Sequence, residues 1–182
     1  MSAPRYFQPG DQVVYPNHGV GVIEAIGQAG NGEGDYYLLT IAASNLRVMV
    51  PQANAAHVGL RPISAAADAA QVLGYLEDAV PAPAASRPGD WKARFRENAD
   101  KLRRGSLAEV AEVLKALVQL HQSKRLSFRE KKMLDRAALL LASELASAQE
   151  LSLADALARI AAALEKAALE LPPLDEDTAI AG

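Results

Sequence analysis

The strongest constraint on the fold is a change of hydrophobic pattern across a proline-rich segment at residues 81–90. Before this segment, short apolar runs are separated by glycine and proline, which is the spacing of β-strands and tight turns. After it, apolar residues recur every three to four positions, as on one face of an α-helix. The three prolines and one glycine within the segment favour an irregular linker. The sequence therefore predicts an α+β chain in which a β part precedes an all-α part.

Short β-prone runs fill the first part of the chain. The predicted strands are residues 12–15, 19–26, 36–41, 46–50 and 57–63. Glycines inside the second run indicate bulges or tight bending, and the glycine-rich stretch 27–35 is typical of a hairpin loop. Strands this short and this closely spaced predict a small, strongly bent sheet or barrel.

Helix start and stop signals divide the second part. A short helix is predicted over 68–79, and Asp90 and Gly105 are expected to bound a helix over 91–104. Three serines, each followed three residues later by an acid, predict further helix starts at Ser106, Ser127 and Ser152. The helix after Ser127 is expected to run to about residue 146, and the last helix to about residue 171. Short connections between these segments favour a helical bundle.

Charge is divided unevenly along the chain. Residues 91–136 hold thirteen basic and six acidic residues, a net charge of +7, whereas the whole chain has a net charge of −3. Residues 1–66 are nearly neutral, and an acidic tail follows from residue 173. A block this basic within an acidic protein indicates a polyanionic partner. A solvated helical surface explains the same charge without any partner, and composition alone does not separate the two.

Several classes of function find no support in the sequence. The chain has no cysteine, and its three histidines lie far apart and outside any metal-ligand spacing, so no metal or other cofactor is expected. Neither a phosphate-binding loop nor a nucleophile–base arrangement is recognisable, so we expect no enzymatic activity. The opening residues lack the apolar core of a signal peptide, and no run of about 18 apolar residues could span a bilayer. A cytoplasmic protein is expected.

Four motifs, in order along the chain, carry a family resemblance. Residues 7–23, Phe7-Gln-Pro-Gly-Asp-Gln-Val-Val-Tyr-Pro-Asn-His-Gly-Val-Gly-Val-Ile23, resemble the opening of the CarD/CdnL family of bacterial transcription regulators. A related module occurs in transcription-repair coupling factors. The later segments that resemble the family are 46–51 together with 58–61, then Trp91-Lys-Ala-Arg-Phe-Arg-Glu-Asn98, and Leu126-Ser-Phe-Arg-Glu-Lys-Lys-Met-Leu134.

The resemblance implies a division of labour. Residues 1–66 would form a Tudor-like domain that binds the RNA polymerase β subunit, and 67–90 a short helix and linker. Residues 91–172 would form a helical domain on promoter DNA at the upstream edge of the transcription bubble, followed by the acidic tail 173–182. Such a protein stabilises the open promoter complex without turnover. We expect a monomer that reaches the nucleoid through RNA polymerase.

The polymerase-binding residues implied by the resemblance are Arg47, Met49 and Pro51. Strand periodicity places Arg47 and Met49 on one face, and an added polymerase strand would gain backbone hydrogen bonds there. The alternative is that Met49 belongs to the core and Arg47 is only solvated. Some family members carry an arginine where this chain has Met49, so the contacts of that arginine are not expected here.

Trp91 is the only tryptophan and begins a helix in the basic block. Its indole could serve as an apolar wedge at a melted base step, or it could pack on the bundle as a helix anchor. The other DNA-contacting residues expected, mainly through phosphates, are Lys92, Arg94, Arg96, Lys101, Arg129, Lys131 and Lys132. DNA binding is expected to be weak, independent of sequence and steeply salt-dependent. A competing hypothesis is an adaptor on RNA polymerase that makes no direct DNA contact.

Overall fold

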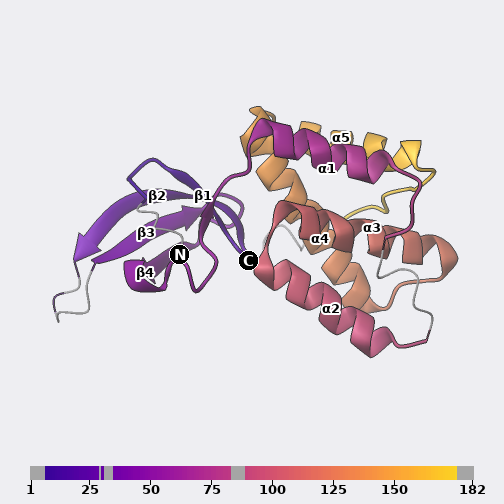
Figure 1. Cartoon of the computed structure of the whole chain (residues 1–182), viewed down its shortest axis with the longest axis horizontal. Coiled ribbons are helices and arrows are strands. Elements are labelled where there is room, and N and C mark those ends of the chain that lie inside the picture. The colour runs from indigo at the N-terminus through magenta and orange to yellow at the C-terminus, as the bar shows by residue number, and fades with distance from the viewer. Residues whose placement is uncertain (1–6, 29, 31–34, 83–88, 176–182) are drawn as a thin grey trace.

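The computed structural model describes residues 7–28, 30, 35–82 and 89–175. A β-sheet occupies one end of the molecule and a group of helices the other (Figure 1), which confirms the predicted α+β architecture. Parts of the expected hairpin loop (29 and 31–34), of the linker (83–88) and of the acidic tail (176–182) lie outside the described residues.

The sheet is antiparallel and open. Its strands are β1 (Gln12–Tyr15), β2 (Gly19–Gln28), β3 (Asp35–Ile41), β4 (Arg47–Pro51) and β5 (Arg61–Pro62). The spatial order is β4-β3-β2-β1-β5, so β4 and β5 form opposite edges. The bent-sheet alternative is therefore confirmed, and closure into a barrel is not observed in the described part of the chain. A register shift between Ile23 and Ala25 gives the β2–β3 pair the expected irregularity.

One face of the sheet holds a small hydrophobic core. Alternation along β3 and β4 buries Tyr37, Leu39, Ile41 and Val50 on this face. The Tyr37 hydroxyl accepts a hydrogen bond of 3.0 Å from the backbone N–H of Phe7, and the two rings meet edge to face. Because the buried positions alternate with exposed ones, the opposite face of β4 is left to solvent.

Five helices make up the larger core. They are α1 (Ala66–Glu77), α2 (Trp91–Arg104), α3 (Leu107–Ser123), α4 (Phe128–Gln149) and α5 (Leu153–Lys166). The side chains of Asp90, Ser106, Ser127 and Ser152 all accept a backbone N–H in the first turn of the next helix, as predicted. Gly105 ends α2 with a φ of 70°. The first helix, α1, packs within the same hydrophobic cluster as α3, α4 and α5.

The last helix ends earlier than expected. We predicted an end near residue 171, but α5 ends at Lys166 because Ala168 adopts a left-handed conformation with a φ of 57°. The N–H of Leu169 then bonds to the carbonyl of Leu164, and that of Ala168 to Glu165, which is a Schellman motif. Leu169 is buried as a result. A left-handed residue also ends α4, about one turn later than expected: Glu150 has a φ of 54°, and the N–H groups of Glu150 and Leu151 both bond to the carbonyl of Ala146.

A buried ion pair joins the sheet to the helices. The guanidinium of Arg61 on β5 donates to both carboxylate oxygens of Glu144 on α4, at 2.7 and 2.8 Å, and to the carbonyl of Gly105. Ser64 donates its backbone N–H and its hydroxyl to the same carboxylate. Glu144 is 4% exposed. Since Arg61 lies on β5, Glu144 on α4 and Gly105 at the end of α2, this joint fixes how the sheet is oriented on the bundle.

Candidate functional site

The β4 edge is the first candidate surface. Within the described residues β4 pairs only with β3, so its outer backbone groups face solvent. Met49 is 61% exposed, which rules out the alternative in which it is a core residue. Arg47 is exposed and lies 3.3 Å from the Glu24 carboxylate, and Pro51 is exposed at the end of the strand. The edge therefore presents an unpaired backbone beside one cation and one flexible apolar side chain.

Trp91 is the second candidate. It is the first residue of α2, and the Asp90 side chain fixes the helix start by accepting the Ala93 N–H at 3.0 Å. The indole is 45% exposed. The indole is therefore not sealed inside the bundle. Trp91 precedes the buried positions of α2, which begin at Asn98.

Trp91 lies in a shallow groove between the start of α2 and the start of α4, here called the Trp91 groove. Its other apolar lining is Leu126 and Phe128, and its cationic lining is Lys124, Arg125 and Arg129. Of this set, Leu126 and Phe128 were not expected to make contacts. Phe128 was interpreted as a helix start alone, yet its side chain is 75% exposed.

A sequence signal could have identified Phe128. The buried positions of α4 follow helical spacing and include Glu130, Met133, Leu134 and Ala137. Glu130 is the first buried residue of α4, and the positions three and four residues before it are 127 and 126, not 128. An aromatic residue outside the buried face, directly after a capping serine, is therefore expected to point into solvent.

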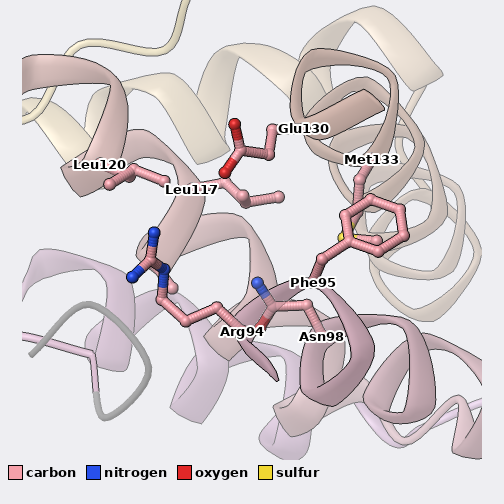
Figure 2. A pocket seen from close by; sticks show the side chains of 8 residues that line it. Arg94, Phe95, Asn98, Leu117, Leu120, Glu130 and Met133 are labelled. Atoms are coloured by element: carbon pink, nitrogen blue, oxygen red, sulfur yellow. The ribbon is translucent and has the colours of Figure 1, made fainter. Parts of the chain in front are cut away.

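The predicted contact residues on α2 occupy different environments. Lys92 and Arg96 are exposed. Arg94 is half-buried and lines a small internal cavity with Phe95 and Asn98, facing Leu117 on α3 and Glu130 on α4 (Figure 2). Lys101 is only 8% exposed, and its ammonium lies 2.8 Å from Glu112 on α3. We therefore leave Lys101 out of the proposed contact set, since its charge is already paired inside the protein.

The predicted cations on α4 also differ. Arg129 is exposed and lines the Trp91 groove. Lys132 is half-buried, with its ammonium 5.3 Å from the centroid of the Phe128 ring. Lys131 lies 2.5 Å from the buried carboxylate of Asp135 and 3.7 Å from Asp175, so part of its charge is neutralised within the chain.

Glu130 is the one acidic residue that lines the Trp91 groove. Burial by itself would raise its pKa, but hydrogen bonds from Ser127 and the charges of Lys124 and Arg94 hold the pKa below its ordinary value. Its carboxylate is committed to the helix cap, accepting the Ser127 N–H at 2.9 Å and the Ser127 hydroxyl at 2.7 Å. The surface of the groove is therefore cationic although its wall contains a carboxylate.

Two features are absent from the described residues, a membrane-spanning helix and a cluster of metal-ligating side chains. In the ranges 7–28, 35–82 and 89–175, no helix has the length and apolarity needed to cross a membrane. Over the same part of the chain, no three histidine, cysteine, aspartate or glutamate side chains converge as metal ligands would.

Comparison with known proteins identifies the chain's relatives. Residues 7–64 match the family model of the CarD-like/TRCF RID domain, and residues 71–161 match that of the CarD C-terminal domain. The "Putative transcription factor YdeB" of Bacillus subtilis (strain 168) is 35% identical over 141 residues, which is 76% of this chain and 90% of that protein. The order and coverage of these matches show that the chain belongs to the CarD family of RNA polymerase-interacting transcription factors.

Proposed function

We propose that this protein is a non-enzymatic transcription regulator that binds the RNA polymerase β subunit through the β4 edge and stabilises the open promoter complex through the Trp91 groove. The single observation that carries the proposal is the half-exposed Trp91 indole in a groove with three cations, on the helical part, while an unpaired strand edge lies on the sheet. Action at the promoter would place the protein at the nucleoid, in the cytoplasm.

The polymerase contact is proposed to be strand addition at β4. A polymerase strand would pair with the outer backbone groups of β4 and gain affinity that depends little on sequence. Arg47, Met49 and Pro51 would supply selectivity, because a forked donor and an adaptable thioether suit a mixed surface. Binding to the polymerase would then raise the effective concentration of the helical part near the promoter.

The DNA contact is proposed to act by differential binding. Lys92, Arg96, Arg129 and Lys132, with the less free Arg94 and Lys131, would approach phosphates near the upstream edge of the bubble. The Trp91 indole would occupy the space next to a base step that is open only in the melted state. Unstacking a step costs about a few kcal/mol. A contact made only after melting therefore shifts the equilibrium toward the open complex by its own free energy.

The lifetime of the open complex on a ribosomal RNA promoter tests this proposal. The unmodified protein is expected to lengthen the lifetime, and Trp91→Ala to lose most of that effect while binding polymerase equally well. Leu153→Ala serves as the matched control, because Leu153 is an exposed apolar residue at the first position of α5. If the unmodified protein leaves the lifetime unchanged, the proposed mechanism is wrong.

The alternative function is an adaptor on RNA polymerase without DNA contact. A photocrosslinking residue at position 91 separates the two functions in an assembled polymerase–promoter complex. Crosslinks to promoter DNA support the proposal, whereas crosslinks to protein alone would favour the adaptor.

A further inference from the structure

Phe128 is the most exposed of the large hydrophobic side chains in the described residues, at 75%. A single exposed phenyl ring is not unusual by itself. Its position is informative, because Phe128 and Arg129 line two different grooves. They therefore form a ridge between the Trp91 groove and a second groove.

The second groove, here called the Phe95 groove, lies between α2 and α4. Its apolar lining is Phe95, Ala99, Leu102 and Met133, and its cationic lining is Arg103, Arg129, Lys132 and Arg136. Asn17, from the turn between β1 and β2, closes one end. No carboxylate is present among the described residues that line it. An apolar floor between cations suits a ligand that alternates flat apolar groups with anionic ones.

The cations of the Phe95 groove are held in place by the fold. Arg136 donates from its Nε to the carbonyl of Asn17 at 3.1 Å, and Arg103 pairs with Asp100 at 2.8 Å on the outer face of α2. Lys132 sits over the Phe128 ring. An aromatic ridge with an ammonium against one face leaves the other face of the ring available for stacking.

We propose that Phe128 stacks on a base of an unpaired DNA strand and that the Phe95 groove carries the adjoining phosphates of that strand. This inference rests on the proposed function. It makes the proposed DNA contact more specific, because the ligand of the Phe95 groove is single-stranded DNA. A protruding ring reaches the face of a base inside a duplex only by unstacking a base step, at a cost of about a few kcal/mol, whereas a base of an unpaired strand offers its face without that cost. Single-strand binding sites combine aromatic platforms with a cationic groove, and both features are present here.

An acidic peptide is the main competing ligand for this chemistry. Acidic side chains would pair with Arg129 and Lys132, and apolar ones would fill the groove floor. Such a ligand has no need of a ring that projects from the ridge. The exposure of Phe128 therefore favours a planar, stacking partner over a peptide.

The first test measures binding of the full-length protein to a labelled oligo-dT strand and to a duplex of the same length, by fluorescence anisotropy at low salt. The protein is expected to prefer the single strand. Phe128→Ala is expected to weaken single-strand binding by about 5- to 100-fold, the range for loss of one base–aromatic stack. The affinity of Phe128→Ala for the duplex should stay within about twofold of that of the unmodified protein, because the cations that contact phosphates remain.

Leu153→Ala is the matched control. Leu153 and Phe128 both follow a capping serine at the first position of a helix, and both are exposed. Single-strand binding unchanged by Phe128→Ala, or lost equally with Leu153→Ala, would overturn the inference. Equal competition by polyglutamate and by unlabelled oligo-dT would also overturn it, because charge alone would then explain binding.

The second test uses the open promoter complex and separates this inference from the proposed function. Phe128→Ala is expected to shorten the lifetime conferred by the protein, by a smaller factor than Trp91→Ala. If the unmodified protein and Phe128→Ala lengthen the lifetime equally, this inference fails while the proposed function stands. If the unmodified protein has no effect on lifetime but still prefers the single strand, the proposed function fails and the binding site stands.

Discussion

The sheet and the helical bundle present two opposite kinds of surface. The β4 edge offers backbone hydrogen bonds, with one cation and one methionine beside them. The two grooves of the bundle offer exposed aromatic rings among cations. A strand edge suits a partner that has a strand of its own, whereas rings among cations suit a polyanion with flat groups. The difference indicates that one small protein can hold two chemically unlike partners without either competing for the other's surface.

The two regions work together only if their relative orientation is fixed. The Arg61–Glu144 joint supplies this constraint, because the carboxylate is buried and receives four hydrogen bonds from Arg61 and Ser64. The largest effect is therefore expected from Arg61→Ala, which leaves the buried Glu144 charge without its partner. We expect a loss of about 3 kcal/mol in the free energy of unfolding, measured by urea denaturation.

A double variant sharpens this first prediction. Arg61→Met with Glu144→Leu removes both charges, and stability should return close to that of the unmodified protein. If orientation matters, this stable variant still binds polymerase and still binds DNA, yet lengthens the open complex less. Full activity in the double variant would show that the two regions act independently.

The next largest effect concerns the sheet alone. Met49→Glu places a charge at an exposed apolar position of the β4 edge, and we expect polymerase affinity to fall by about 10- to 100-fold, the loss from about 1.4 to 2.8 kcal/mol. Folding should be unaffected, because the side chain is already exposed. Leu153→Glu makes the same kind of change on the bundle and should leave polymerase affinity unchanged. Similar losses in both variants, measured by surface plasmon resonance, would contradict the assignment of β4.

The salt dependence of DNA binding distinguishes a cation on the surface, Arg129, from one that is paired inside the protein, Lys101. Arg129→Gln should reduce the slope of log affinity for DNA against log salt by about 0.9, as for loss of one phosphate contact. Lys101→Gln should leave the slope unchanged, because its ammonium is paired with Glu112. Lys101→Gln should instead lower the free energy of unfolding. Equal slopes for the two variants would mean that burial does not decide which of these cations contacts a phosphate.

The sequence was sufficient to predict the elements whose causes are local. Asp90 and Gly105 bound α2 as expected, because capping and left-handed backbone geometry act within one turn. The end of α5 was missed because Ala168 adopts the conformation that glycine usually provides, in order to bury Leu169. The open form of the sheet was likewise not decided by the sequence, since it depends on whether β4 and β5 meet in space.

The candidate site was predicted in part, for the same reason. The degree of exposure of Trp91 depends on how α2 packs against α4, so it could not be inferred from the segment that contains Trp91. The partner of Lys101 comes from another helix, so its burial could not be inferred from its own segment. The Lys131–Asp135 pair, in contrast, has i,i+4 spacing and was recognisable in the sequence. Phe128 could also have been found, because it lies outside the buried face of α4.

The smallest expected effect is on how the free energy of unfolding depends on pH, through Glu130 at the start of α4, which lines the Trp91 groove. The pKa of Glu130 is held below its ordinary value in the folded protein, so the folded state binds this proton less readily than the unfolded chain. The stabilisation is therefore fully present above the unfolded pKa of about 4.3, and is lost as the pH falls through the lower folded pKa. Glu130→Gln should be less stable than the unmodified protein at pH 7, and the difference should shrink on acidification. Urea unfolding of both proteins from pH 7 down to the acid range measures this convergence, and a constant difference would show that the charge of Glu130 does not stabilise the start of α4.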